Sequence, residues 1–318
     1  MKGFRLSVCA ILASKRRSFC RREPRGGLGF GGYDLCFLKK EDKATQKIYS
    51  IGTHMKKMMT WLVLLLFLAG CSSVPLTGRK QVLLVSDQDV LASSLTQYSD
   101  YIKTAKKSTN QKQAAQVTRV GKKIAAATEA YLKANGMGEE VKNFSWEFNL
   151  VADPQVNAFC MPGGKIVVYE GLMPLISSDD DLAVVLGHEV AHAVAKHSNE
   201  RMSQQLMAQY GAALLGVAVS NKSAAVQQAA NAVYGVGTQY GVMLPFSRKH
   251  ESEADYMGLV LMTIAGYNPD AAVGFWQKMS AGSGGSTPEF MSTHPSDGRR
   301  IAEIRQELPA IKAKYGKK

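Results

Sequence analysis

Cysteine is scarce in this sequence, and its placement excludes internal crosslinks. Of the five cysteines in the 318 residues, Cys9, Cys20 and Cys36 lie among the first 54 residues, and Cys71 ends an apolar segment. Only Cys160 remains in the rest of the chain. Because a disulfide needs two thiols, residues 72–318 hold no internal disulfide even in an oxidising compartment.

Long apolar runs are also missing. The run from Trp61 to Leu68 and the uninterrupted apolar part of residues 206–220 are both shorter than the roughly 20 residues that cross a bilayer as a helix. The pattern therefore speaks against an integral membrane protein. We expect residues 206–220 to form a core helix or a helix that covers a cleft. Internal repeats and extended low-complexity segments are absent too, so the chain is not a repeat array.

Most of the chain lacks a strong net charge of either sign. The formal charge is +13, but +8 of it lies in residues 1–54, and Lys56 and Lys57 add two more. This leaves +3 from Cys71 onward, which is ordinary for a soluble domain. The basic composition therefore gives no ground for nucleic-acid binding, and we expect none.

A targeting signal is present instead. The segment MKKMMTWLVLLLFLAGC, which begins at Met55, has two lysines, a short apolar run and small residues before Cys71. It resembles a bacterial lipoprotein signal peptide. The resemblance implies that residues 55–70 are removed, that Cys71 carries lipid, and that Ser72 directs the protein to the outer membrane. We expect translation to begin at Met55 and residues 1–54 to be a disordered upstream extension that is not native.

The remaining chain reads as an α+β domain that is mainly helical. We expect a tether over residues 71–94 and a domain over residues 95–318, which begins with a helix over residues 95–136. Strand-like runs then flank Pro162-Gly163-Gly164, a sequence typical of a hairpin. Helices dominate the rest, with Ser178 as an N-cap. Three glycines mark a flexible connection before the helix that contains SRKHESEADYMG: Gly235, Gly237 and Gly241.

The segment LGHEVAHAVAKH contains the pattern H-E-x-x-H. Residues four apart share one helix face, so His188 and His192 can bind the same metal ion, while Glu189 lies at the edge of that face. Zinc accepts such ligands and keeps one position open for water in catalytic sites. Two exposed histidines would give the same pattern by chance, so the interpretation requires a third ligand.

A later helix offers that ligand. The pattern H-E-x-x-H-x-x-G-x-x-H fails because Ala195 and Ser198 occupy its last two positions, and His197 points off the face, as expected of a surface histidine. In RKHESEADYMG, Glu251 and Asp255 share a face, whereas Glu253 is rotated away. We predict that Glu251 is the third zinc ligand. Asp255 then accepts an imidazole N–H and fixes its tautomer, although a solvated helix charge is the alternative.

Four motifs resemble a family of gluzincin metallopeptidases. They are NAFCMPGGKIVVYEGL, LGHEVAHAVAKH, SRKHESEADYMGL and STHPSDGRRI, which together cover about residues 75–305 in the family's order. The family includes the CAAX prenyl endopeptidases, HtpX, the Oma-type mitochondrial protease and the periplasmic BepA-type proteases. The resemblance implies a zincin-like fold with one Zn²⁺ per subunit. It also implies a small sheet whose edge strand, with Asn157, Ala158 and Phe159, borders the active-site cleft and receives the substrate as an added strand.

The last motif supplies His294 and Arg300. In the family this histidine and an arginine six residues later approach the cleft, so both are candidate catalytic residues that donate to the oxyanion. In some periplasmic members the histidine instead occupies the open position of the zinc and holds the enzyme latent. Arg300 has a second interpretation as a structural residue of the C-terminal helix. The sequence leaves these alternatives open.

These features predict a zinc-dependent endopeptidase of the cell envelope. Its substrates would be misfolded or unassembled envelope proteins, with the lipid anchor placing it at the periplasmic face of the outer membrane. The alternative is a chaperone or assembly factor for outer-membrane proteins with a latent zinc site, for which the outer-membrane assembly machinery is a candidate partner. Processing of prenylated peptides is not expected, because the family members that perform it are integral membrane enzymes.

Overall fold

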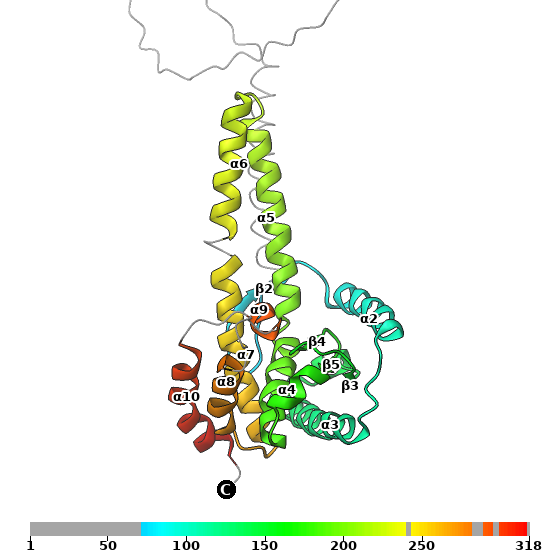
Figure 1. Cartoon of the computed structure of the whole chain (residues 1–318). Coiled ribbons are helices and arrows are strands. Elements are labelled where there is room, and N and C mark those ends of the chain that lie inside the picture. Colours follow the sequence, from blue (N-terminus) through cyan, green and yellow to red (C-terminus); the bar gives the residue numbers. More distant parts are fainter. Residues whose placement is uncertain (1–70, 240–242, 282–288, 295–298, 317–318) are drawn as a thin grey trace, which may run out of the picture. The chain divides into compact units, whose positions relative to one another are not determined.

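The computed structural model describes residues 71–239, 243–281, 289–294 and 299–316 (Figure 1). The predicted extension and signal peptide, residues 1–54 and 55–70, lie outside these ranges. The helices and strands, in chain order, are β1 Cys71–Ser73, β2 Lys80–Val82, α2 Asp87–Thr104, α3 Gln111–Ala134, η1 Gly138–Asn143, β3 Glu147–Val151, β4 Ala158–Met161, β5 Lys165–Tyr169, η2 Glu170–Leu175, α4 Asp179–Val194, α5 His197–Val219, α6 Ala224–Thr238, α7 Leu244–Ile264, α8 Ala271–Ala281, α9 Glu289–Thr293 and α10 Arg300–Tyr315. The prediction of a mainly helical α+β fold is confirmed.

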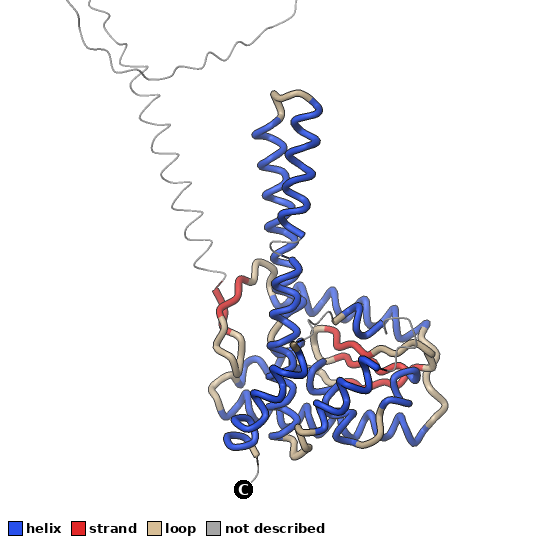
Figure 2. Tube along the Cα trace, turned by 60° about the vertical axis from the view of Figure 1, so that its left-hand side comes forward, coloured by secondary structure: helices blue, strands red, loops and turns tan. Residues whose placement is uncertain are grey.

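A three-stranded sheet lies between helices, as Figure 2 shows. Its order is β3-β5-β4, with β3 parallel and β4 antiparallel to the central strand. The side chains of β5 alternate between two clusters: Ile166 and Val168 pack with α3 and α4, whereas Val167 packs with Tyr98 of α2. Strand β5 is therefore covered on both faces. Strand β4 pairs with it along one side and lies at an edge of the sheet.

The predicted hairpin between β4 and β5 is confirmed. Gly163 and Gly164 adopt φ angles of 92° and 80°, a backbone conformation that side chains with a Cβ rarely adopt. At Gly164 a Cβ would also collide with the ring of Trp146, which lies 2.5 Å from that position. The glycine pair therefore sets the turn that returns the chain from the edge strand to the centre.

The segment before the sheet differs from the prediction. Instead of a tether over residues 71–94, β1 and β2 form an antiparallel pair, and α2 begins at Asp87 with Ser86 as its N-cap. The single helix expected over residues 95–136 is two helices, because α2 ends at Thr104 and α3 starts after the capping residue Asn110. Short strands and a second cap carry little periodic signal, so the sequence did not reveal them.

Helices α4 and α7 cross at a pair of glycines, and this crossing positions the functional residues. The predicted cap Ser178 accepts a hydrogen bond from the backbone of Asp181, and apolar residues of α4 such as Leu182, Val185 and Leu186 are buried. A Cβ built on Gly187 would lie 2.8 Å from the carbonyl oxygen of Gly258. The two backbones therefore approach more closely than larger residues permit.

We expect Gly258→Ala to separate α4 from α7. The added methyl group would lie 2.8 Å from the backbone nitrogen of His188, so the helices must shift, at a cost of about 1–3 kcal/mol typical of overpacking. Chemical denaturation would measure this loss. Gly216→Ala in α5 is the matched control, because among the described residues no atom outside its own helical backbone lies within 4 Å of its Cβ position. Equal stability of the two variants would contradict the close approach.

Of the two alternatives expected for residues 206–220, the core helix is wrong. This segment belongs to α5, which pairs with α6 in an antiparallel hairpin extending beyond the other described helices of its unit (Figure 1). Tyr210, Leu214 and Val217 on α5 and Val233 on α6 are 67–75% exposed. Gly235 and Gly237 lie inside α6 rather than in a connection, and Gly241 falls outside the described residues. Among the described residues, no helix has the length and apolarity to span a bilayer.

Candidate metal centre

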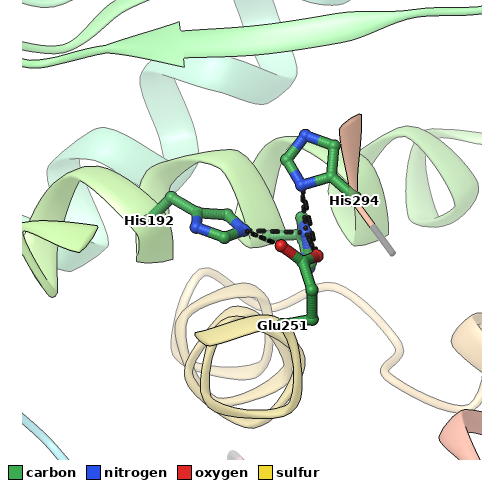
Figure 3. A group of neighbouring side chains, drawn as sticks. His192, Glu251 and His294 are labelled. Carbon is green, nitrogen blue, oxygen red and sulfur yellow. Dashed lines mark hydrogen bonds and ion pairs between the residues drawn. The ribbon is translucent and has the colours of Figure 1, made fainter. Parts of the chain in front are cut away.

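Side chains from two helices and from the residue after a third helix converge beside the edge strand. Helix α4 carries His188 and His192, α7 carries Glu251, and His294 follows α9 directly. One ligand atom of each of these four residues lies within 4.8 Å of the ligand atoms of the other three. Figure 3 shows His192, Glu251 and His294 pointing toward one another. The helix spacing and the α4–α7 crossing thus bring together the residues that the sequence suggested as ligands.

The donor set fits a cation such as zinc. Nε2 of His188 lies 3.1 Å from Nε2 of His192 and 3.2 Å from Oε2 of Glu251. Oε1 of Glu251 is buried and has no hydrogen-bond partner among the described atoms. Facing imidazole lone pairs and a buried carboxylate repel one another unless a proton or a metal ion lies between them. Three imidazoles and one carboxylate are ligands that zinc favours.

His294 lies between the other ligands and Glu189. Its Nδ1 is 3.3 Å from Nε2 of His188 and 3.2 Å from Oε2 of Glu251. Its Nε2 is 3.4 Å from Oε1 of Glu189. The ring stacks on Phe290, with centroids 4.5 Å apart. This side chain therefore lies close enough to the other three to act as a fourth ligand, and its other nitrogen faces the predicted base.

Glu189 is buried beside the ligands without being one of them. Its Oε2 accepts a hydrogen bond from the backbone N–H of Cys160 in β4, at 2.9 Å, and its Oε1 has no hydrogen-bond partner among the described atoms. Burial raises the pKa of Glu189, which makes the carboxylate a better proton acceptor near neutral pH. The residue therefore has one oxygen fixed by the edge strand and one directed toward His294.

A cavity of about 330 Å³ opens beside this group. Phe159 and Cys160 of the edge strand line one part of it, and the first turns of α5 contribute Arg201, Met202 and Gln205. Asn157 precedes β4, where its carbonyl accepts a hydrogen bond from Tyr169, so this residue anchors the strand. The cavity thus places the predicted base and ligands beside a strand edge.

Asp255 and Arg300 lie behind the ligands. Oδ1 of Asp255 is 2.9 Å from Nδ1 of His188, and Arg300 donates from Nε to Oδ2 of Asp255 at 2.6 Å. Arg300 also lies 3.4 Å from Oε2 of Glu251 and stacks on Trp276 at 3.9 Å. Of the two interpretations of Arg300, these contacts favour the structural one, because its side chain is 5% exposed and pairs with both carboxylates.

The protonation of the two α4 histidines differs when no metal is present. Although burial opposes the charged imidazolium, hydrogen bonds to Asp255 and Glu251 raise the pKa of His188 to about 9. Burial lowers the pKa of His192 well below its ordinary value. Zinc binding must therefore displace a proton from His188 at neutral pH, and His192 offers a free lone pair.

The expectation that His197 is a surface histidine is wrong. Its side chain is 2% exposed, and its Nδ1 lies 2.9 Å from Nδ1 of His192. Helix α4 ends at Val194, and Lys196 adopts a left-handed φ of 57°, so the chain changes direction before α5 begins. The residue five positions after His192 therefore returns toward it. If α4 continued unbroken through His197, this residue would lie off the face of His188 and His192, so helical spacing alone does not predict the contact.

Comparison with known proteins agrees with this geometry. The model of Peptidase family M48 matches residues 111–308. The chain is 38% identical over 200 residues to the mitochondrial metalloendopeptidase OMA1 of Schizosaccharomyces pombe. These residues make up 62% of this chain and 54% of that protein. It is 27% identical over 197 residues to the metalloprotease YcaL of Escherichia coli, covering 60% of this chain and 76% of YcaL.

A third relative is the beta-barrel assembly-enhancing protease of Yersinia pestis. The chain is 30% identical to it over 175 residues, which cover 52% of this chain and 35% of that protein. The chain thus spans about half of the OMA1 protein of Schizosaccharomyces pombe and about a third of the assembly-enhancing protease. The matched region contains every candidate ligand, together with Glu189, Asp255 and Arg300.

Proposed function

The chain belongs to peptidase family M48, and from this premise we propose that it is a zinc-dependent endopeptidase of the cell envelope that cleaves misfolded or unassembled proteins. One observation carries the proposal: three imidazoles and the Glu251 carboxylate converge beside a buried glutamate and a strand edge. His188, His192 and Glu251 would hold the zinc. Bound there, zinc would act as a Lewis acid and lower the pKa of water.

The side chains of the protein supply the remaining steps. The edge strand β4 offers backbone groups to a substrate strand, which aligns a peptide bond with the cavity. Glu189 accepts the proton of the attacking water and returns it to the departing amine. Asp255 fixes the tautomer of His188 through its Nδ1, and Arg300 holds both Asp255 and Glu251 in position.

The envelope location rests on the sequence. The predicted lipoprotein signal before Cys71 supports a lipid anchor, and two relatives are the bacterial metalloprotease YcaL and a beta-barrel assembly-enhancing protease. Other relatives are named mitochondrial, so their names alone do not favour the envelope. Mass spectrometry of the native protein tests the anchor, because a diacylglyceryl group on an N-terminal Cys71 is expected.

Cleavage of an unfolded protein tests the activity. Purified protein is incubated with casein, with and without a chelator, and zinc is then restored to the chelated sample. We expect fragments that disappear with the chelator and return with zinc. A protein that binds zinc yet leaves casein and short peptides intact under all conditions would refute the endopeptidase proposal.

Two observations favour a second candidate function, a chaperone whose zinc site is latent. His294 lies within the ligand group, where it would exclude a substrate carbonyl. The α5–α6 hairpin also exposes apolar side chains, including Leu214, Val217 and Val233, which apolar segments of an unfolded chain can contact. In the casein experiment this function predicts binding without cleavage.

We expect His294→Ala to increase casein cleavage about tenfold, because a site that is mostly closed gains activity in proportion to its open fraction. Initial rates of cleavage, measured with zinc in excess, would show the change. The double variant Glu189→Gln/His294→Ala is the control and should be inactive, which would place the new activity at the same site. A fall in rate with unchanged zinc content would instead assign His294 as a donor to the reacting carbonyl.

A further inference from the structure

The two histidines of α4 receive different support behind their ligand atoms. His188 has a carboxylate as its direct partner, since Asp255 lies 2.9 Å from its Nδ1. His192 has another imidazole there, since Nδ1 of His197 lies 2.9 Å from its Nδ1. A metal-binding histidine usually donates its second N–H to a carboxylate, a carbonyl oxygen or water. The imidazole partner of His192 therefore needs its own explanation.

A carboxylate stands at the far end of this second imidazole. Nε2 of His197 lies 3.0 Å from Oε2 of Glu253, and Glu253 is buried although the sequence suggested that it turns away from the site. Arg79 donates to Oε2 of Glu253 at 2.8 Å, and the hydroxyl of Thr77 donates to Oε1 at 2.5 Å. Both carboxylate oxygens of Glu253 thus accept hydrogen bonds from the turn between β1 and β2, which holds the side chain in place.

The hydrogen bonds from His192 through His197 to Glu253 determine which imidazole nitrogen of each histidine carries a proton. Glu253 only accepts hydrogen bonds, so Nε2 of His197 carries the proton and Nδ1 of His197 is an acceptor. Nδ1 of His192 must then donate, which leaves the lone pair of its Nε2 free for a metal ion. The opposite arrangement would place two acceptors or two donors face to face.

Packing keeps His197 in this orientation. Its ring stacks on His250, with centroids 4.2 Å apart and planes inclined by 15°. Nε2 of His250 lies 2.9 Å from Oε2 of Glu200, and Arg79 pairs with Glu200 at 2.7 Å. Arg79 therefore joins the two carboxylates beneath the stacked rings. All of these side chains are buried or nearly so, which shields the hydrogen bonds from water.

We infer that His197 is a positioning residue for zinc: with Glu253, it fixes His192 in the tautomer and orientation that bind the metal. Arg79 and Thr77 hold Glu253, the last member of this series of hydrogen bonds. The segment before α2 therefore has a role in the metal site. The inference rests on zinc binding at the proposed site and concerns metal affinity, so it does not depend on which substrate is cleaved.

Zinc affinity of side-chain variants tests the inference. His197→Leu removes both hydrogen bonds, and we expect a zinc affinity about 10–100-fold weaker in competition with a chromophoric chelator. His197→Gln keeps an acceptor and a donor about as far apart as the two ring nitrogens, and should retain an affinity within a few-fold of wild type. Glu253→Gln should fall between these two. Equal affinity of the Leu variant and the wild type would overturn the inference.

The unaltered protein provides a second test that does not depend on folding of a variant. Long-range ¹H–¹⁵N correlation spectra of the zinc-loaded protein report which nitrogen of each imidazole is protonated. We expect a proton on Nδ1 of His192 and on Nε2 of His197. A proton on Nδ1 of His197 would overturn the inference. If the wild-type protein bound no zinc at all, the proposed function would fail first, and the two failures are thereby distinguished.

Discussion

Glu189→Gln is expected to abolish casein cleavage while the protein still binds zinc. The substitution preserves shape, and the amide oxygen can still accept the hydrogen bond from Cys160 at the edge strand. It removes the basic oxygen that receives the proton of water, and the loss of a general base typically lowers the rate by about 10²–10⁴-fold. Zinc should remain, because the converging ligand atoms come from other residues.

Paired measurements separate these two effects. Zinc content by elemental analysis and the cleavage rate should be determined on the same preparation of Glu189→Gln. Glu139→Gln is a matched control, because the side chain of Glu139 is 87% exposed and pairs with Lys142 in a surface salt bridge. The control should retain full activity. Undiminished proteolysis by Glu189→Gln would remove Glu189 from the mechanism.

The sequence identifies side chains that converge in the structure, because helix geometry is local. Spacing by four places His188 with His192 and Glu251 with Asp255, whatever the rest of the fold does. Which two helices face each other depends on long-range packing. Here the close approach of Gly187 and Gly258 sets that packing, and a single sequence does not identify it as a contact.

Two residues behind the ligands, His197 and Arg79, are not predicted by the sequence, for reasons that lie in the backbone. His197 appeared to face solvent because the helix was extended through Lys196, whose left-handed conformation ends it. Ion pairs with Asp87 and Glu140 hold the Lys196 side chain. The spacing of apolar residues does not predict that a lysine adopts a left-handed backbone conformation. Arg79 belongs to the turn between β1 and β2, and the sequence of this segment, with Pro75 and Gly78, is equally typical of a tether.

The apolar stretch in α5 is more exposed than its composition predicts. An apolar run usually indicates burial, but an apolar helix is also stable when a second helix covers one of its faces. In α5 and α6 the facing sides cover each other, with Tyr234 of α6 donating a hydrogen bond to the carbonyl of Ala208. The outer sides, including Leu214 and Val217, remain exposed. Composition alone does not distinguish these two arrangements.

Glu251→Gln is expected to have the largest effect on zinc binding. The carboxylate is the one anionic member of the converging group, and its Oε1 has no hydrogen-bond partner among the described atoms. Its replacement by a neutral amide removes a ligand, so the affinity should fall by more than the roughly 10–100-fold typical of losing a supporting hydrogen bond. Chelator competition would measure the change, and Glu139→Gln again serves as the control. Zinc affinity equal to wild type would contradict the assignment of Glu251 as a ligand.

The same variant should also change the stability of the metal-free protein in a pH-dependent way. Although burial opposes it, the neighbouring His192 and His188 hold the pKa of Glu251 far below its ordinary value of 4.5. A depressed pKa contributes stability above pH 4.5, and this contribution disappears as the pH falls below that value. The raised pKa of His188, about 9 against an ordinary 6.5, contributes below pH 6.5 and is lost as the pH rises toward 9. Denaturation of the chelated proteins should therefore show the greatest difference between wild type and Glu251→Gln between these limits, near pH 5 to 6. A difference that grew steadily toward alkaline pH would show that His188 and Glu251 do not stabilise each other in the metal-free state.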